Sequence, residues 1–259
     1  MKLSVAIATY NEEKKLGACL ASVSSWVDEI VVVDGGSTDK TLTIAQKYNA
    51  RIIKTNNPAI FHINKQKALD ACKGEWILQL DADEVVTSDL RDEILAVLSP
   101  QSSVLSPKSN GYYIPRKNYF WGHWMKKGGQ YPDYVIRLVR NGKASFPAKS
   151  VHEQIKVQGE VGYLKEPMEH ISYSTKEDYW KKAERYTTLQ AMEMKSLHLP
   201  ITVGLWLTYN VVKPVTVFVS LFILHKGFVD GWYGLIFAYW SALHYAIAYT
   251  KYRKLINKT

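Results

Sequence analysis

Short β-branched segments alternate with segments of helical character through the first hundred residues, and this alternation constrains the fold more than any other feature. The predicted strands are Leu3–Ala8, Glu29–Val33, Ala50–Lys54 and Glu75–Leu80. The predicted helices are Glu12–Ser25, Thr38–Tyr48, Ile63–Cys72 and Ser88–Leu98. Strands that alternate with helices form βαβ units, in which helices cover both faces of a parallel sheet. We therefore expect an α/β fold with a mostly parallel sheet flanked by helices.

Beyond Pro107 the pattern changes to strands joined by an aromatic, glycine-containing stretch. The strands predicted here are Gly111–Arg116, Tyr134–Arg140, Gln154–Val157 and Val161–Leu164. The segment Ser174–Glu177 has the spacing of a capping box and predicts an amphipathic helix that runs to about Leu197. We divide the chain into an α/β part (1–106), a second part of the same domain (107–172) and a helical C-terminal region (173–259).

The composition excludes several classes of protein. With 47% hydrophobic and 22% charged residues among 259, the chain is not disordered. Its two cysteines, Cys19 and Cys72, cannot form a disulfide framework, and no Cys/His cluster suggests zinc. The mean hydropathy of −0.18 argues against a polytopic membrane protein but is compatible with a membrane-attached one. The apolar run at residues 3–8 is too short for a signal peptide, so we expect a cytoplasmic catalytic part.

The last sixty residues combine apolar stretches with positive charge. Ile201–Leu224 and Gly231–Thr250 are each long enough to cross a bilayer, but Lys213 and Pro214 interrupt the first. Residues 200–259 hold six basic side chains and one acid, which is more than half of the net charge of +9. This combination is typical of proteins that bind an anionic membrane surface, not nucleic acid. We expect helices embedded in the cytoplasmic leaflet; the alternatives are a spanning hairpin and a buried helical pair.

Acidic residues directly follow two strands of the α/β part. Asp34 follows the second strand, and Asp81 and Asp83 follow the fourth. The carboxyl ends of parallel strands line the ligand crevice of an open α/β sheet, so we expect these side chains to face one pocket. Two carboxylates at i and i+2 can hold Mg²⁺ or Mn²⁺, which in turn bridges the oxygens of a diphosphate. Gly35-Gly36 is not followed by the G-x-G-x-x-G pattern, which argues against a Rossmann oxidoreductase.

Three ordered motifs lie within residues 1–100. They are Thr9-Tyr10-Asn11-Glu12, Asp34-Gly35-Gly36-Ser37-Thr38-Asp39-Lys40-Thr41 and Ala71-x-x-Gly74-Glu75-Trp76-Ile77-x-x-Leu80-Asp81-Ala82-Asp83-Glu84. As a set they closely resemble the inverting glycosyltransferases of family 2, which have the GT-A fold. The resemblance implies a GT-A-type α/β fold with a C-terminal membrane-associated helical segment.

The later part of the chain carries a looser set of motifs. They are Trp121-Gly122, Gly128–Asp133, Arg137–Arg140, Val151-His152-Glu153, His170 and Gly227–Gly231. This set is similar to a narrower group, the membrane-associated enzymes that add glucose to the lipopolysaccharide inner core. With it the resemblance extends over nearly the whole chain.

The resemblance implies which residues bind a nucleotide-sugar donor. By analogy, Thr9 and Glu12 border the nucleotide, and Asp34 contacts its base or ribose. The basic candidates for the same donor are Lys65, where Asn64-Lys65-Gln66-Lys67 departs from the family's usual Arg-Asn, and one of Arg137 and Arg140.

The resemblance also implies a Mg²⁺ or Mn²⁺ cofactor. Asp83 is the expected direct ligand, and Asp81 supports both the nucleotide and the metal. His152 and His170 are further candidates to complete the metal site or to contact the pyrophosphate; each has an ordinary structural role as its alternative.

Inversion by a single displacement requires a general base on the acceptor hydroxyl. Many members of the family use an Asp, often in Glu-Asp, but that dipeptide occurs here only in a predicted helix start at 177–178. Glu153 is therefore our candidate for the base and Asp133 is the alternative. Four aromatic residues either form a platform for the acceptor sugar or pack against the sheet: Tyr119, Phe120, Trp121 and Trp124.

Together these features predict a metal-dependent inverting glycosyltransferase that moves a hexose to an envelope glycan at the membrane. The expected donor is glucose from a UDP-sugar, and the expected acceptor is a lipopolysaccharide or lipooligosaccharide core or another glycolipid. Residues 1–106 would bind donor and metal, 107–172 the acceptor, and 173–259 the cytoplasmic face of the inner membrane, peripherally or monotopically.

Three alternatives remain at the level of the sequence. A polyprenyl-phosphate glycosyltransferase also works at the membrane. A nucleotidyltransferase would need a Gly-rich basic loop after Ala8, which this sequence lacks. A non-catalytic membrane adaptor with a GT-A fold would have no need for Asp34, Asp81 and Asp83 together.

Overall fold

The computed structural model describes residues 2–58, 60–99, 109–147 and 154–257. The chain divides into two compact units. The first unit comprises 1–116 and 134–170, and the second comprises 117–133 and 171–259. The second unit thus combines the aromatic stretch at 117–133 with the C-terminal segment that begins at Ile171.

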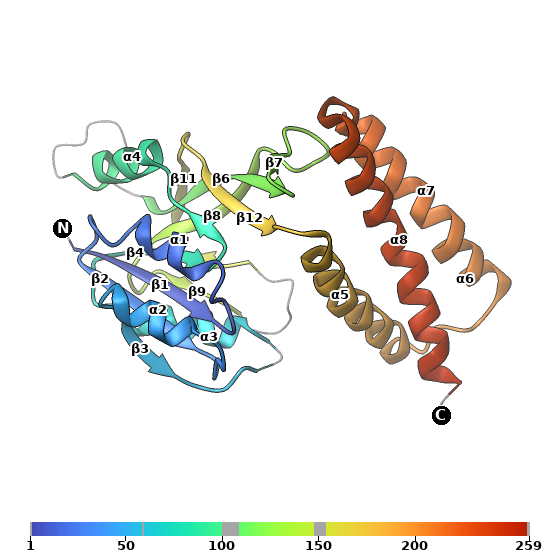
Figure 1. The fold of residues 1–259 in the computed structure, drawn as a ribbon, viewed down its shortest axis with the longest axis horizontal. Coiled ribbons are helices and arrows are strands. Elements are labelled where there is room, and N and C mark those ends of the chain that lie inside the picture. The colour runs from blue at the N-terminus through green and yellow to red at the C-terminus, as the bar shows by residue number, and fades with distance from the viewer. Residues whose placement is uncertain (1, 59, 100–108, 148–153, 258–259) are drawn as a thin grey trace. The chain divides into compact units, whose positions relative to one another are not determined.

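A mixed sheet forms the centre of the first unit (Figure 1). Its principal strand order is β3-β2-β1-β4-β8-β6-β12-β5, and β11 and β7 pair with β6. The strands are β1 (Leu3–Thr9), β2 (Glu29–Asp34), β3 (Arg51–Lys54), β4 (Trp76–Asp81), β5 (Glu84–Val85), β6 (Ser109–Phe120), β7 (His123–Trp124), β8 (Asp133–Arg140), β11 (Glu160–Tyr163) and β12 (Met168–Tyr173). A separate pair joins β9 (Ala144–Ser145) to β10 (Lys156–Val157).

The expectation of a mostly parallel sheet is correct for β3, β2, β1 and β4, whereas the rest of the sheet mixes antiparallel pairs with the parallel pair of β6 and β11. β3, β2, β1 and β4 are parallel, as the βαβ pattern predicts. β8 then pairs antiparallel with β4, and β12 pairs antiparallel with β5. The physical reason is that each parallel neighbour needs a long crossover connection, usually a helix, and the described residues between α4 and β12 contain no helix.

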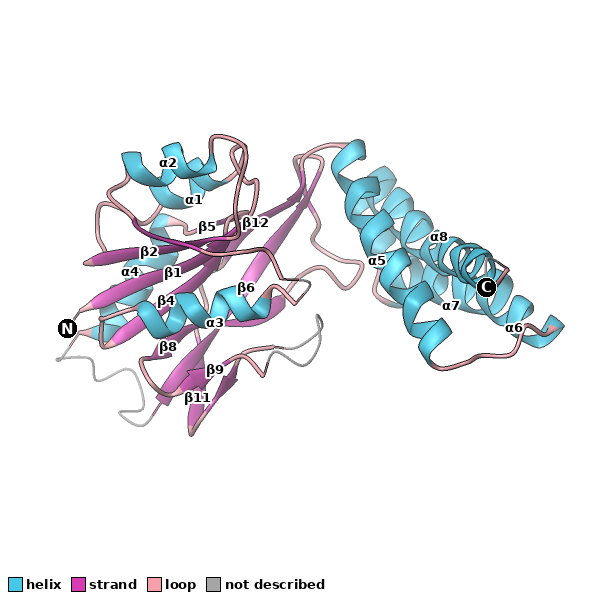
Figure 2. Cartoon of the chain, turned by 90° about the horizontal axis from the view of Figure 1, so that it is seen from below, coloured by secondary structure: helices cyan, strands magenta, loops and turns pink. Residues whose placement is uncertain are grey.

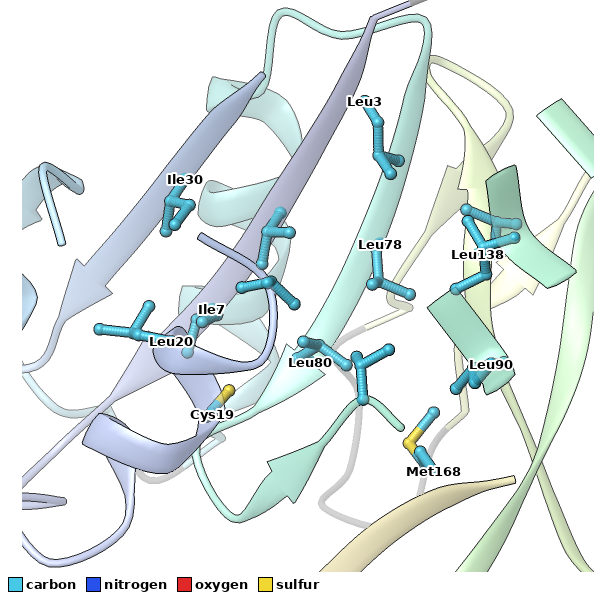
Figure 3. Packing of buried hydrophobic residues seen from close by; sticks show 14 of the residues in the cluster. Leu3, Ile7, Cys19, Leu20, Ile30, Leu78, Leu80, Leu90, Leu138 and Met168 are labelled. Carbon is cyan, nitrogen blue, oxygen red and sulfur yellow. The ribbon is translucent and has the colours of Figure 1, made fainter. Parts of the chain in front are cut away.

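Helices pack on both faces of the parallel part of the sheet (Figure 2). They are α1 (Leu16–Ala21), α2 (Thr41–Lys47), α3 (His62–Ala71) and α4 (Ser88–Leu98). Alternate strand residues face opposite ways: Val5 and Val32 pack with α1, α2 and α4, whereas Ala6 and Val31 pack with α3. Figure 3 shows the first of these cores, where Cys19 and Leu20 of α1 approach Ile7 and Leu80.

The helix predictions differ in accuracy for local reasons. α4 has the predicted bounds because the Thr87 hydroxyl accepts a hydrogen bond from Leu90 N–H, as an N-cap does. α1 is only six residues long instead of the expected Glu12–Ser25. Residues 11–13 are held by hydrogen bonds to the neighbouring loop, and this keeps the first turns irregular.

Helices dominate the second unit. They are α5 (Lys176–Ser196), α6 (Val203–Leu207), α7 (Lys213–Phe218), two π-helical segments (Thr208–Val212 and Val219–Leu224), a 3₁₀ turn (Gly227–Asp230) and α8 (Gly231–Ile256). α6, α7 and the π segments form one continuous helix, Val203–Leu224. In the part of the chain that the structure describes, this is the one helix long and apolar enough to cross a membrane. α8 packs against both α5 and α7 (Figure 2).

Candidate donor and metal site

The carboxyl ends of β1, β2 and β4 meet at one edge of the sheet. The parallel register pairs Thr9 with Asp34 and Ala8 with Asp81. The strand pairing thus brings the two acidic positions to the same edge of the sheet, as parallel strands that end together do, and the prediction that their side chains face one pocket stays a prediction.

Asp34 organises the loop that follows β2. Its side chain is buried, and its Oδ2 accepts hydrogen bonds from the backbone N–H groups of Gly36 (3.0 Å) and Ser37 (2.9 Å). Its Oδ1 accepts from the hydroxyls of Ser37 and, at 3.3 Å, Thr9. Both oxygens thus hold the loop in place. A direct contact of Asp34 with the base or ribose stays a prediction.

The loops after β1 and β2 are joined by reciprocal hydrogen bonds. Thr38 N–H donates to Asn11 Oδ1 (2.8 Å), and Asn11 N–H donates to Ser37 Oγ (2.8 Å). Glu12 N–H donates to Thr41 Oγ1 (2.8 Å), which fixes the backbone at this predicted donor-binding position. The two loops that should border the nucleotide therefore form one rigid rim.

Asp81 lies between two cations. Lys65 Nζ from α3 contacts its Oδ1, and Arg137 Nη2 from β8 donates to its Oδ2 at 2.7 Å. Burial alone would raise the pKa of Asp81, but the charges of Arg137 and Lys65 outweigh burial and hold that pKa well below its usual value. Lys65 and Arg137, which we predicted as donor-binding residues, are thus found on the Asp81 carboxylate.

A buried carboxylate continues this charge network. Glu84 is fully buried; its Oε1 accepts from Arg137 Nη2 (2.7 Å) and lies 3.4 Å from Arg116 Nη1. Its Oε2 accepts from Asp81 N–H at 3.0 Å. Burial lowers the pKa of Arg137, whereas Asp81 and Glu84 raise it to a net value above its usual range. Arg137 therefore stays protonated and ties β8 to the turn after β4.

Asp83 faces a different pair of side chains. Its Oδ2 lies 3.6 Å from Lys15 Nζ, and its Oδ1 lies 3.6 Å from His170 Nε2. His170 comes to this position because β12 pairs antiparallel with β5, with His170 opposite Glu84. Of the two histidines considered from the sequence, the structure thus brings His170 to the acidic turn.

The candidate bases are placed differently. Glu153 and His152 lie outside the described residues. Asp133 belongs to the second unit, where its Oδ2 accepts a hydrogen bond from Asn118 Nδ2 at 3.1 Å. Among the aromatic candidates, Phe120 is buried and stacks on Trp121, with Tyr179 and Trp240 around it. Phe120 therefore packs against side chains of α5 and α8, whereas from the sequence we considered packing against the sheet.

Three charged side chains of this network were not among the site residues predicted from the sequence. They are Lys15, Glu84 and Arg116. Glu84 was visible as the last acid of Asp81-Ala82-Asp83-Glu84, but nothing local indicated its complete burial. Lys15 and Arg116 reach the site from α1's N-terminal flank and from β6, so only the tertiary fold identifies them.

Comparisons with known proteins place this arrangement in a family. The sequence model named Glycosyl transferase family 2 matches residues 4–172. The lipopolysaccharide core biosynthesis glycosyltransferase LpsC of Rhizobium meliloti (strain 1021) is 29% identical over 265 residues, which cover 93% of this chain and 91% of LpsC. An uncharacterized glycosyltransferase of Rickettsia bellii (strain RML369-C) is 35% identical over 102 residues, covering 39% of this chain and only 34% of that relative.

One of the solved structures that match this chain is that of Staphylococcus aureus TarS 1–349 in complex with UDP-GlcNAc. It aligns with a TM-score of 0.49 and 18% identity, over 97% of this chain and 88% of that chain. The family model covers more than half of the chain, including every motif from Thr9 to His170. The chain therefore belongs to glycosyl transferase family 2 and is a glycosyltransferase.

Proposed function

We propose that this glycosyltransferase moves a hexose, expected to be glucose from a UDP-sugar, to a lipopolysaccharide core or a related glycolipid, with inversion. The similarity to LpsC over almost the whole chain supports the acceptor class. The observation that carries the donor class is the charge at the carboxyl edge of the sheet. There, four permanent cations surround three carboxylates: Lys15, Lys65, Arg116 and Arg137 around Asp81, Asp83 and Glu84.

The site fits a divalent cation that is bound partly by side chains of the protein and partly by the donor. Asp83 and His170 offer an oxygen and a nitrogen 3.6 Å apart, whereas both oxygens of Asp81 already face cations. We therefore assign the metal to Asp83 and His170, with Asp81 supporting the site. Within the described ranges no group of three or more His, Cys, Asp or Glu side chains could hold a metal ion. A Mg²⁺ or Mn²⁺ ion bound by one or two side chains normally completes its shell with substrate phosphates and water.

Different residues of the chain would position the nucleotide, hold the charges of the site and accept a proton. The bound ion would supply positive charge at the diphosphate leaving group. The rim formed by the loops after β1 and β2 would position the nucleotide. Arg137 and Lys65 hold Asp81 ionised and in place, and Lys15 adds positive charge beside Asp83. Glu153 is proposed to take the proton from the acceptor hydroxyl, with Asp133 as the alternative.

The reaction products test this function. The full chain, UDP-glucose, Mn²⁺ and a deacylated lipopolysaccharide core should yield UDP and a glucosylated core, detected by mass spectrometry. Omission of the metal should stop both products. Release of pyrophosphate would indicate a nucleotidyltransferase, and transfer to polyprenyl phosphate in preference to the core would favour the rival glycosyltransferase class.

We further propose that the C-terminal region attaches the enzyme to the cytoplasmic face of the membrane. One side of the helix Val203–Leu224 exposes an apolar residue at every fourth position: Val203, Leu207, Val211, Val215, Val219 and Ile223. We call this set the apolar stripe. A continuous stripe on a long helix is the pattern of a helix that lies in a membrane interface.

The packing of α5 favours this interfacial arrangement over a spanning hairpin. α5 follows α8 along its length: Tyr179 Oη lies 3.0 Å from His244 Nε2, and Lys195 Nζ donates to Leu255 O at 3.3 Å. The outer side of α5 carries exposed charges, including Lys181. If α8 crossed the bilayer, α5 would enter it as well, at a prohibitive cost for these charges.

Lys213, which interrupts the apolar sequence, does not oppose this arrangement. Its Nζ lies 3.9 Å from the ring centroid of Tyr209 and 5.3 Å from that of Tyr245. Cation–π contacts of this kind stabilise a desolvated ammonium group. The side chain therefore folds back on the protein and leaves the stripe apolar.

The triple variant Val211→Ser/Val215→Ser/Val219→Ser should weaken binding to lipid vesicles by roughly tenfold or more, because each change removes apolar surface that the membrane would cover. Vesicle co-sedimentation measures the effect. The matched control is Ile63→Ser/Leu95→Ser/Met192→Ser, which changes exposed apolar residues of other helices. Equal binding of the two triple variants would contradict attachment through the stripe. Deletion of 200–259 is a poorer test, since α8 also covers the buried side of α5.

A further inference from the structure

The turn between the long apolar helix and α8 has its polar residue inside and its apolar residues outside. Asp230 is buried at 5% exposure. Four large apolar side chains around it are half or more exposed: Leu224 (71%), Phe228 (51%), Val229 (54%) and Trp232 (66%). We call these four residues the apolar tip. A turn that faces water normally exposes its polar residues and buries its apolar ones. An exposed apolar tip therefore indicates a surface that contacts a partner.

The buried Asp230 anchors a distant loop beside this tip. Its Oδ1 accepts from Lys126 N–H (2.9 Å) and its Oδ2 from Lys127 N–H (2.8 Å), while His123 Nε2 lies 3.2 Å from Oδ1. Gly128 N–H donates to His225 O at 2.9 Å. Figure 1 shows the loop after β7 reaching this turn. Segments about a hundred positions apart in the sequence are thus joined by hydrogen bonds.

Glycine makes the backbone conformation of this loop possible. Gly128 and Gly129 have φ angles of +66° and +72°, and a Cβ on Gly128 would lie 3.6 Å from Gly227 Cα. The loop therefore lies directly on the turn, and its contacts with Asp230 come from the backbone N–H groups of Lys126 and Lys127 rather than from their side chains.

The loop and the turn bring exposed positive charge to the part of the chain that carries the tip. Lys126 and Lys127 are exposed, as is Lys226 in the turn itself. Asp230 is the one acid of residues 117–133 and 200–257 besides Asp133, and its charge is already occupied by the loop's N–H groups. An apolar tip with exposed lysines on the same part of the chain is complementary to a bilayer surface that carries anionic headgroups.

We propose that the apolar tip inserts between the headgroups of an anionic leaflet and that Lys126 and Lys127 give the enzyme its preference for anionic lipid. This inference rests on the membrane attachment proposed above and names the part of the chain that selects the lipid. The lysines come from the segment 117–133, outside the C-terminal stretch in which the sequence concentrates its basic residues.

The test compares the full chain with two variants on vesicles of phosphatidylcholine alone and of phosphatidylcholine mixed with phosphatidylglycerol. Phe228→Ser/Val229→Ser should lower affinity for both vesicle types. Lys126→Gln/Lys127→Gln should lower affinity for the anionic vesicles roughly ten- to thirtyfold and leave binding to neutral vesicles unchanged. The control Lys47→Gln/Lys165→Gln removes the same charge from exposed positions in the first unit. Thermal unfolding checks that every variant is folded.

The outcomes separate this inference from the attachment itself. Wild-type protein that binds no vesicle would overturn both proposals. Wild-type binding with unchanged behaviour of the Lys126/Lys127 variant, or an equal loss by the Lys47/Lys165 control, would overturn only the lipid preference. A tip variant that binds vesicles normally but changes the oligomeric state in light scattering would show that a second copy covers the tip, and would also overturn the inference.

Discussion

Replacing Asp83 by asparagine should reduce glucosyl transfer by on the order of 100- to 1000-fold, because it removes the charge that we propose holds the donor's metal. Asp83 is the acid of the turn that faces His170 rather than a pair of strong cations. The amide has nearly the same size, so the turn should keep its shape. Turnover of UDP-glucose measures the loss of transfer. Mn²⁺ binding by the protein without donor measures the loss of metal affinity, and both quantities should fall.

The matched control for this prediction is Asp92→Asn. Asp92 is 64% exposed in its side chain, and its carboxylate pairs with the neighbouring Arg91. The change removes the same charge outside the site and should alter turnover less than twofold, as surface substitutions generally do. His170→Ala should weaken Mn²⁺ binding as Asp83→Asn does. Normal turnover by Asp83→Asn, or a loss of turnover with intact Mn²⁺ binding, would refute the metal assignment.

The parallel strands of the α/β part could be predicted because each is marked by a short stretch of its own sequence. β1, β2 and β4 are mainly apolar runs, with Ser4 and Gln79 as interior polar residues, and each ends at a polar residue. Their predicted ends are correct to within one residue. The meeting of Asp34 with the Asp81 turn followed directly, because parallel strands carry their carboxyl ends to the same edge.

The partners of these acids could not be predicted from local patterns. Arg137 reaches Asp81 through an antiparallel pairing of β8 with β4, and His170 reaches Asp83 through a pairing of β12 with β5. Neither pairing has a signature in the sequence near those residues. A sequence pattern thus identifies residues that end a strand, whereas the charges that surround them depend on contacts between distant segments.

The C-terminal region could likewise be predicted only in part, because its arrangement also depends on contacts between distant segments. Apolar length and basic composition indicated a membrane-associated helical pair, but the position of α5 along α8, which argues against crossing, is a tertiary contact. Likewise, Asp230 stood within the motif Gly227–Gly231, yet its role as the anchor of Lys126 and Lys127 required the fold.

Replacing Arg137 by methionine should lower the free energy of unfolding by about 3–5 kcal/mol, because it leaves Glu84 fully buried without its closest cation. Chemical denaturation at neutral pH measures the loss. The control is Arg140→Met on the same strand, whose side chain is 41% exposed and pairs with the half-exposed Glu75, so it should cost less than about 1 kcal/mol. Equal losses in the two variants would contradict a special role of the buried pair. Adding Glu84→Gln to Arg137→Met should recover part of the loss.

The pH dependence of stability gives a second measure of the same network. Burial raises the pKa of Asp81, but Arg137 and Lys65 lower it further, so the net pKa in the folded protein lies below that of the unfolded chain. Asp81 therefore stabilises the fold above the unfolded pKa of about 3.9, and this contribution is lost as the pH falls through the folded pKa. Without Arg137 the difference between the two pKa values shrinks. The Arg137→Met variant should consequently lose less stability than the wild type on acidification from pH ~7 to ~3. An equal or steeper loss would show that Arg137 does not control the charge of Asp81.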